Sequence, residues 1–240
     1  MKAIILAAGR GRRLPKNLSK KPKVLLKIGN QTILEKQIKN FKAVGIKDIA
    51  LVTGYNSKSL SKFKNKKFHN EKWSKTNMVY SLLKAHSWLK KYNCLISYGD
   101  IFYEKKALIK LKKSTNPISL LYDKNWIRLW KKRFKNPLND AETFKISKNK
   151  ITEIGQKTKN LNAIKGQYMG LIKITPKGWI NFRMCLKKNF KDDFKKIYLT
   201  DVFHQLIQNK ISIFGISYSG KWAEVDSKKD YEIMINTFKK

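Results

Sequence analysis

The segment "LAAGRGRRLPKNLSKKPKVLLKIG" spans residues 6–29 and follows directly on an apolar run at residues 3–6. It places glycine at positions 9 and 11, and eight of its side chains are Lys or Arg. A buried strand that ends in a glycine-rich, cationic loop is suited to holding an anion, because backbone N–H groups can approach a ligand closely where no Cβ stands in the way. The alternative is one more solvated stretch of a basic protein.

The chain as a whole is strongly basic, with 54 Lys and Arg against 16 Asp and Glu and a formal net charge of +38. Such a charge favours nucleic acid or an anionic membrane surface as a partner. However, only six of these residues are Arg, and the Lys residues are spread along the entire chain. Nucleic-acid surfaces concentrate Arg for bidentate contacts. We therefore interpret the charge as an amino-acid bias, against which three of six Arg at positions 10–13 stand out.

The length of 240 residues suits one large domain with an elaborated insert, and a hydrophobic content of 42% is enough for a core. No apolar run approaches the roughly 20 residues of a membrane helix, and the N-terminus lacks a signal-peptide pattern. Cys94 and Cys185 have no metal-like spacing. These features predict a cytoplasmic protein with free thiols.

Strand-like and helix-like segments alternate in the first half of the chain. Apolar strands are expected at 2–8, 48–53, 94–98 and 117–122. Helices are expected at 32–44, where Thr32 and Glu35 form a capping box, at 77–92, where Asn77 can act as the cap, and at 104–113. This alternation predicts a mostly parallel sheet with helices on both faces.

The second half has a different pattern. It predicts a hairpin of 142–147 and 151–154, strands at 167–174 and 211–217, and helices at 176–188, at 199–208 and after Asp226 or Ser227. The expected fold is a doubly wound, mostly parallel, Rossmann-like α/β domain over 1–240, with an inserted antiparallel portion at about 123–170. Ligands bind at the carboxyl ends of the strands in such sheets, which places the 9–23 loop and Gly99-Asp100 at one edge.

The loop matches neither of two familiar nucleotide motifs. No Gly-Lys-Ser/Thr closes it, as the Walker A motif requires, and Leu14 stands where the dinucleotide fingerprint has its third glycine. A glycine loop remains, whose backbone N–H groups can approach phosphate oxygens while Arg13 and Lys23 add positive charge.

The full pattern resembles a known family. "LAAGRGRRL" followed by "PKVLLKIG" is similar to the signature of the nucleotidyltransferases that activate sugar phosphates and phosphocholine-type monoesters, with Gly9, Gly11, Arg13, Pro22 and Lys23 at the motif positions. "SYGDIFY" resembles the strand that delivers a metal-binding Asp in that family, and "WAEVDSKKDY" resembles its C-terminal Glu-x-Asp-Ser element. The "YSL" and "VDS..DY" elements look closer to the phosphocholine and 2-aminoethylphosphonate cytidylyltransferases than to the sugar enzymes.

The resemblance implies that CMP is transferred from CTP to a small phosphate or phosphonate monoester, such as phosphocholine or 2-aminoethylphosphonate, with release of pyrophosphate. Such an acceptor is already an anion near neutral pH, since its second pKa is about 6, so the enzyme needs no general base and must neutralise and position its substrates. Lys23 and Arg13 are the candidate catalytic residues. The expected nucleotide site comprises Leu6, Ala7, Ala8, Gly9, Gly11, Arg13, Lys23, Asn77 and Ser81.

Asp100 and Asp226 are the candidate ligands for Mg²⁺, which prefers carboxylate oxygens. Both are expected at the end of strands of one sheet, where two close carboxylates without a cation would raise each other's pKa. Asp226 could instead serve only as a helix cap.

The acceptor site has two alternative interpretations. Tyr80, Trp126 and Tyr168, with Trp130 and Trp222, could form an aromatic wall around a quaternary ammonium group. Asp123, Asp140 and Glu142 could instead pair with a primary amine. Glu224, in the C-terminal Glu-x-Asp-Ser element, is a further candidate substrate-binding residue.

Two other functions compete with this assignment: a sugar-1-phosphate nucleotidyltransferase, and a basic nucleic-acid-binding protein that has lost catalysis. The joint presence of Lys23, Asp100 and Asp226 favours an active enzyme. Its expected partners are a nucleoside triphosphate and a small phospho- or phosphono-monoester, without nucleic acid or a membrane span, and the chain could form a homo-oligomer.

Overall fold

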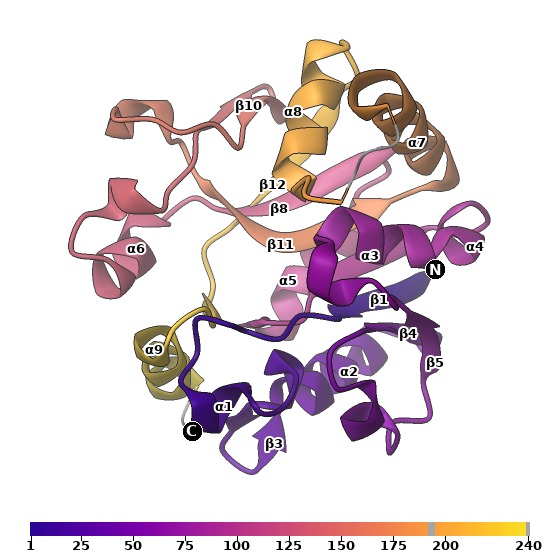
Figure 1. Ribbon diagram of the computed structural model, residues 1–240. Helices are drawn as coiled ribbons and strands as arrows, with labels where there is room; N and C mark the ends of the chain where they lie inside the picture. Colours follow the sequence, from indigo (N-terminus) through magenta and orange to yellow (C-terminus); the bar gives the residue numbers. More distant parts are fainter. Residues whose placement is uncertain (192–194, 239–240) are drawn as a thin grey trace.

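The computed structural model describes residues 1–191 and 195–238 (Figure 1). Within them, a central sheet has nine strands in the order β5-β4-β1-β6-β11-β8-β12-β10-β9. The strands are β1 (Lys2–Ala7), β4 (Ile49–Thr53), β5 (Lys66–His69), β6 (Cys94–Tyr98), β8 (Ile118–Asp123), β9 (Phe144–Ser147), β10 (Lys150–Ile154), β11 (Gln167–Ile174) and β12 (Ile213–Tyr218). β5, β4, β1 and β6 pair in parallel, as do β8 and β12, while β11 runs antiparallel between β6 and β8. The fold is therefore the expected mostly parallel, doubly wound sheet.

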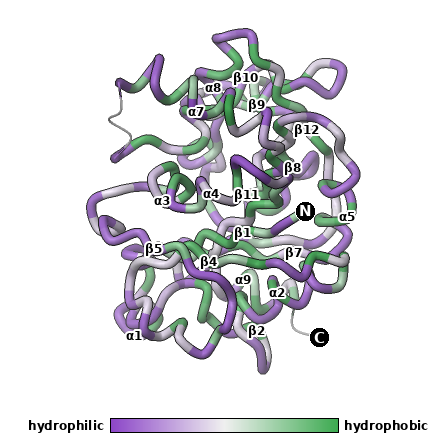
Figure 2. The backbone as a smooth tube through the Cα atoms, turned by 90° about the vertical axis from the view of Figure 1, so that its right-hand side faces the viewer, coloured by the Kyte–Doolittle hydropathy of each residue, from purple (hydrophilic) through white to green (hydrophobic). Residues whose placement is uncertain are grey.

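Helices cover both faces of the sheet because successive strand residues point to opposite sides. Ile5 joins the core beneath α2 (Ile33–Ala43), α5 (Lys105–Lys113) and α6 (Ile127–Arg133). Its neighbour Ile4 joins the core beneath α3 (Met78–Lys84), α4 (His86–Leu89), α7 (Pro176–Phe190) and α8 (Leu199–Gln208). Figure 2 shows this as hydrophobic colouring along the central strands and hydrophilic colouring in outer loops.

A smaller layer brings the C-terminal segment to the edge of the main sheet. β7 (Ile101–Tyr103) pairs antiparallel with β13 (Trp222–Glu224), and α9 (Lys228–Phe238) packs on them through a third core that includes Phe102 and Met234. β2 (Lys27–Ile28) and β3 (Gln31–Thr32) form a second short ribbon, and α1 (Lys16–Ser19) lies in the loop before it. The backbone N–H of Val225 donates to the carbonyl of Asp100 at 2.9 Å. The β7–β13 ribbon therefore places residues 224–226 beside residue 100.

Three expectations about local structure were wrong. The helix expected at 77–92 is divided at Ala85 into α3 and α4, and the Asn77 side chain donates to the carbonyl of Lys196 at 2.7 Å instead of capping α3. Asp226 follows the β7–β13 ribbon and not a strand of the central sheet. Of the two caps expected for α9, the structure shows Ser227, whose hydroxyl accepts from the N–H of Asp230 at 3.2 Å.

Other expectations were confirmed. The capping box of Thr32 and Glu35 is present, and the strands that were expected lie within a few residues of their ranges, whereas β5 and the short strands β2, β3, β7 and β13 were not expected. The portion expected as an insert contains α6 and the antiparallel β9–β10 hairpin. In the described residues, none of the helices combines the length and the apolar character that crossing a membrane requires.

Candidate active site

The glycine loop after β1 is shaped around a lysine side chain. Gly11 has a φ of +73°, which favours glycine, and a Cβ there would lie 2.8 Å from Cγ of Lys23. The missing side chain thus leaves room for the aliphatic stem of Lys23 to pass the loop. In contrast, a Cβ at Gly9 would meet nothing within 4 Å, so the backbone there is open to a ligand.

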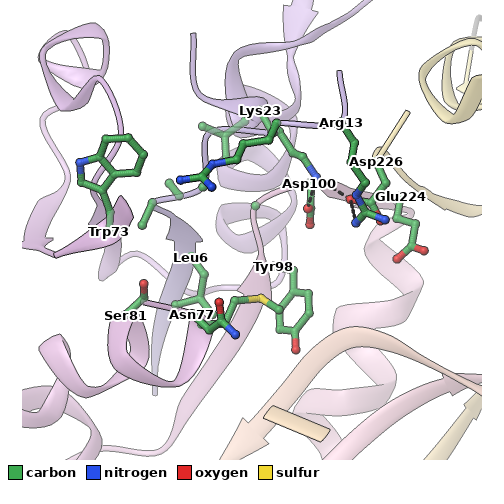
Figure 3. Close-up of a pocket in the computed structure, with 18 of the residues that line it drawn as sticks. Leu6, Arg13, Lys23, Trp73, Asn77, Ser81, Tyr98, Asp100, Glu224 and Asp226 are labelled. Atoms are coloured by element: carbon green, nitrogen blue, oxygen red, sulfur yellow. Dashed lines mark hydrogen bonds and ion pairs between the residues drawn. The ribbon is translucent and has the colours of Figure 1, made fainter. Parts of the chain in front are cut away.

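A cleft of about 370 Å³ opens at the carboxyl ends of β1 and β6 (Figure 3). It is lined by Leu6, Ala7, Ala8, Gly9, Gly11, Arg12, Arg13, Lys23, Val24, Trp73, Thr76, Asn77, Met78, Ser81, Tyr98, Gly99, Asp100, Tyr198, Glu224 and Asp226. Each residue expected in the nucleotide and metal sites therefore lies on this one cleft, as does Glu224.

The ammonium group of Lys23 lies between the two expected metal ligands. Its Nζ is 2.9 Å from Oδ2 of Asp100 and 2.6 Å from Oδ1 of Asp226. The Lys23 side chain is only 13% exposed. Nη2 of Arg13 reaches the same oxygen of Asp226 at 2.8 Å. An ammonium group carries three N–H donors, so two are taken by carboxylates and one remains for an anion in the cleft.

Ion pairs with nearby side chains shift the pKa values of Asp226 and Lys23. Burial alone would raise the pKa of Asp226, but Lys23, Arg13 and Arg133 outweigh it and hold this pKa below its usual range. Burial would likewise lower the pKa of Lys23, and the two carboxylates raise it above its ordinary value. The expectation that the carboxylates face each other unscreened was therefore wrong for Asp226, because Lys23 lies between them.

A buried amide fixes the turn that carries Asp100. Nε2 of Gln37, from α2, donates to the carbonyls of Tyr98 at 3.0 Å and of Ile101 at 2.5 Å. Gln37 is fully buried. Within this turn, a Cβ on Gly99 would lie 2.4 Å from the carbonyl oxygen of Leu6. Close packing against β1 and two hydrogen bonds together hold Asp100 at the sheet edge.

The opposite wall of the cleft is organised by another buried amide. Nδ2 of Asn70 donates to the hydroxyls of Thr76 at 3.0 Å and of Ser81 at 2.9 Å. Asn70 is fully buried, so these bonds fix the 72–77 loop against α3. The same loop carries Trp73, which packs edge-on against Tyr55. This wall is uncharged and combines Trp73 and Met78 with the polar residues Thr76, Asn77 and Ser81, unlike the charged wall across the cleft.

The aromatic wall expected around the acceptor is not formed by the residues proposed for it. The described residues that line the cleft do not include Tyr80, Trp126 or Tyr168. Trp126, Trp130 and Trp222 are at most 5% exposed and belong to the core beneath α6. The Tyr80 hydroxyl lies 3.5 Å from the Glu71 carboxylate, and Tyr168 packs edge-on against Tyr98. The three tryptophans are therefore buried in the hydrophobic core, and the two tyrosines are partly buried outside the described cleft lining.

The acidic alternatives are also committed to structure. Asp123 accepts from Nε1 of Trp222 at 2.8 Å, and Asp140 accepts from Nε1 of Trp130 at 3.1 Å. Burial raises the pKa of Glu142. Glu224 is the acidic candidate that lines the cleft, and burial, with the nearby Asp226 and Asp100, raises its pKa to about 7 despite the contact with Arg133.

The donor set fits a hard divalent cation. No group of three or more His, Cys, Asp or Glu side chains in the described residues is arranged to hold a metal, but Mg²⁺ commonly uses one or two carboxylates together with water and substrate phosphates. Three cations and five carboxylates form one network here, a formal excess of two negative charges: Arg13, Lys23, Arg133, Asp100, Asp140, Glu224, Asp226 and Asp230. That excess favours a divalent cation.

Several cleft residues were missed by the sequence analysis. Tyr98 sits directly before Gly99 at the end of β6, so its position in the motif strand could have indicated it. Trp73, Thr76 and Met78 lie in a loop and at the start of a short helix, and Tyr198 begins α8. No local pattern marks these four as cleft residues, because the sheet edge brings together segments that are distant in sequence.

Fold and cleft together define a nucleotidyltransferase: a doubly wound sheet with a glycine loop, a lysine and two carboxylates at the carboxyl ends of its strands. Residues 3–117 match the model of the MobA-like NTP transferase domain. The chain is 35% identical over 251 residues to the CTP:phosphoglutamine cytidylyltransferase of Campylobacter jejuni, covering 98% of this chain and 99% of that protein. The chain therefore belongs to the same nucleotidyltransferase family as this cytidylyltransferase.

Other similarities agree with this family. The chain is 38% identical over 86 residues to the choline-phosphate cytidylyltransferase of Streptococcus pneumoniae, covering 34% of this chain and 38% of that one. The inositol-1-phosphate CTP transferase of T. maritima superposes with a TM-score of 0.78 at 20% identity over 98% of this chain and 95% of that one. At this identity, the superposition shows the shared fold.

Proposed function

We propose that this chain transfers CMP from CTP to an oxygen of a small phosphate or phosphonate compound and releases pyrophosphate. The observation that carries the reaction type is the Lys23 ammonium group, held between Asp100 and Asp226 inside a cleft that the glycine loop also lines. The preference for CTP is supported by the full-length similarity to a cytidylyltransferase.

The proposed mechanism is one of neutralisation and positioning. The acceptor oxygen attacks the α-phosphorus of CTP, and the bond from that phosphorus to the bridging oxygen of pyrophosphate breaks. The attacking oxygen is already an anion at neutral pH, so no side chain has to remove a proton. The free N–H of Lys23 and the exposed guanidinium of Arg13 offset the charge that two anions bring together. The backbone N–H groups of residues 8–13 are the proposed donors to the triphosphate oxygens.

Asp100 and Asp226 are the proposed ligands for Mg²⁺. When bound, Mg²⁺ would neutralise phosphate oxygens and help to orient them. We expect Asp100→Asn and Asp226→Asn each to abolish most turnover, and the double variant to be little worse than either single one, since groups that act as a unit are not additive. Turnover measured as magnesium is titrated in the presence of CTP tests this expectation. Additive losses of turnover in the double variant would exclude a metal site shared by Asp100 and Asp226.

For the acceptor, we propose a small phosphorylated or phosphonate compound that carries an amino or quaternary ammonium group, with phosphoglutamine as the first candidate and phosphocholine or 2-aminoethylphosphonate next. The support for phosphoglutamine is that the relative of that name matches nearly the whole chain. Glu224, which lines the cleft, supports an acceptor with an ammonium group, whereas Tyr80, Trp126 and Tyr168, the aromatic residues expected to bind choline, are not among the described residues of its lining.

A panel of pyrophosphate-release assays tests both the proposed preference for CTP and the proposed class of acceptor. Each of the four ribonucleoside triphosphates is combined with phosphoglutamine, phosphocholine, 2-aminoethylphosphonate and glucose 1-phosphate. We expect CTP with an amino-bearing acceptor to give the highest kcat/KM. A clear preference for UTP with glucose 1-phosphate would instead support the sugar-1-phosphate nucleotidyltransferase.

A further inference from the structure

A buried arginine outside the cleft lies directly behind its charged wall. Arg133 is the last residue of α6, and its side chain is only 1% exposed. It is one of six Arg in a chain that uses Lys nearly everywhere else. Arg128, five residues earlier on the same helix, is exposed. Full burial of a guanidinium group is costly unless carboxylates and hydrogen bonds compensate for the lost water.

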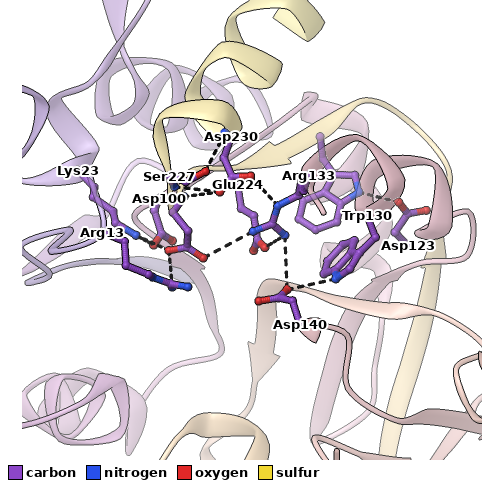
Figure 4. A network of polar contacts seen from close by, with 12 residues as sticks. Arg13, Lys23, Asp100, Asp123, Trp130, Arg133, Asp140, Glu224, Ser227 and Asp230 are labelled. Carbon is purple, nitrogen blue, oxygen red and sulfur yellow. Dashed lines mark hydrogen bonds and ion pairs between the residues drawn. The ribbon is translucent and has the colours of Figure 1, made fainter. Parts of the chain in front are cut away.

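The guanidinium group of Arg133 contacts carboxylates from three separate segments (Figure 4). Nε donates to Oδ1 of Asp230 at 2.9 Å, and Nη1 donates to Glu224. Nη1 also lies 3.9 Å from Asp140, and Nη2 lies 3.7 Å from Oδ2 of Asp226. The planar fork of Arg suits several carboxylates at fixed angles, which a lysine ammonium on its flexible stem does not.

The two oxygens of Asp226 are divided between the cleft and this buried cation. Oδ1 faces Lys23 and Arg13, while Oδ2 faces Arg133. The contact between Nη2 of Arg133 and Oδ2 of Asp226 is too long for a hydrogen bond, but the positive charge behind Oδ2 favours the orientation in which Oδ1 faces the cleft.

Arg133 also fixes the backbone of this segment through Asp230. Oδ2 of Asp230 accepts from the N–H of Asp226 at 3.1 Å and from the N–H of Ser227 at 2.9 Å. Oδ1 of the same carboxylate is the partner of Arg133. The guanidinium group is in turn flanked by the rings of Trp130 and Phe134, with centroids 4.9 Å and 4.8 Å away. The orientation of the fork is therefore constrained by rings as well as by carboxylates.

We propose that Arg133 is a positioning residue for the transfer reaction: it orients the carboxylates of Glu224 and Asp226 toward the cleft and ties the α6 segment to them. Arg133 does not line the cleft and acts through these carboxylates. The expected fall in kcat on replacing Arg133 rests on the proposed function, while the expected change in the position of the Asp226 carboxylate does not.

The test compares Arg133→Lys and Arg133→Met with the matched control Arg128→Lys. For Arg133→Lys, we expect kcat to fall about tenfold to a hundredfold with little change in KM for CTP, since small misplacements of reacting groups cost this much. In the Asp226→Asn background, the same change should have less effect, because both act on one unit. Arg128→Lys should keep wild-type kinetics.

A crystal structure of Arg133→Lys supplies the readout that needs no turnover. We expect the 2.6 Å contact between Lys23 and Asp226 to be lost. A retained contact would overturn the proposal even if the wild type proved inactive, which by itself would refute only the proposed function. Wild-type kcat per folded molecule in either variant would also overturn it. If Arg133→Met fails to fold, Arg133→Lys carries the test.

Discussion

Replacing Lys23 by Met removes the cation that lies between Asp100 and Asp226 and keeps most of the side-chain volume. Loss of an electrostatic contact to the transition state costs about 3 kcal/mol, so turnover should fall on the order of a hundredfold. Breaking a fully buried ion pair costs about 3–5 kcal/mol of folding stability. Here the side chains of Asp100 and Asp226 are 31% and 21% exposed, and Arg13 still pairs with Asp226. We therefore expect a stability loss of about 1–2 kcal/mol.

The stability difference should depend on pH in a defined way. The pKa of Asp226 is lowered in the folded state, so its contribution is present above the unfolded value, about 3.9, and is lost as the pH falls through the folded value. The pKa of Lys23 is raised, so its contribution is present below about 10.4 and is lost at higher pH. The difference between wild type and Lys23→Met should therefore be constant between about pH 5 and pH 10 and smaller at pH 3.

Urea unfolding at pH 7.5 and pH 3, together with initial rates of pyrophosphate release, measures both effects. Lys21→Met is the matched control, because Lys21 is exposed two residues earlier and should change neither quantity. A folded Lys23→Met variant with wild-type turnover would refute the catalytic role. A stability loss of the same size at both pH values would refute the ion-pair reasoning.

Three further changes have expected outcomes. Gly99→Ala should destabilise the fold by about 1–3 kcal/mol in urea unfolding, because its Cβ would meet the Leu6 carbonyl, whereas Gly9→Ala should stay within about 0.5 kcal/mol; equal losses would contradict the packing. Gln37→Met removes the two buried hydrogen bonds to the turn that carries Asp100, so it should lower the free energy of unfolding by about 1–2 kcal/mol and weaken the response of turnover to magnesium. An unaltered magnesium titration would show that these two hydrogen bonds do not position Asp100 for the metal. Burial raises the pKa of Glu224 from 4.5 to about 7, so wild-type stability should decrease as the pH rises through this window, and Glu224→Gln should gain stability relative to wild type between pH 5 and pH 8; a pH-independent difference would exclude this titration.

The cleft could be predicted from sequence wherever a short segment carries the information. Gly9, Gly11 and Asp100 closely follow the apolar strands β1 and β6, and Lys23 follows in the same glycine-rich motif. The topology of a doubly wound sheet assembles the ends of such strands at one edge. The role of Gly11 is different from the expected one, since its missing Cβ also makes room for Lys23. That packing depends on tertiary geometry, which the motif alone does not contain.

Other features were beyond local patterns. The break at Ala85 lies inside a continuous apolar periodicity without glycine or proline, so nothing marked it. The tryptophans of the expected aromatic wall are buried, because an aromatic side chain packs equally well in a core and around a ligand. Arg133 did carry a signal, since an arginine in a lysine-rich chain indicates a need for planar, bidentate contacts. That signal was applied only to residues 10–13.

The central claim is tested most directly by phosphorus NMR of a reaction that contains the protein, CTP, Mg²⁺ and phosphoglutamine. We predict that the acceptor phosphate resonance is replaced by coupled resonances of a CMP–phosphate anhydride, with one pyrophosphate released for each product molecule. Phosphocholine and 2-aminoethylphosphonate, tested in parallel, should give the corresponding anhydrides if they are the better acceptors. Unchanged CTP with every acceptor, or release of CMP and pyrophosphate without an acceptor-linked product, would contradict the proposed transfer.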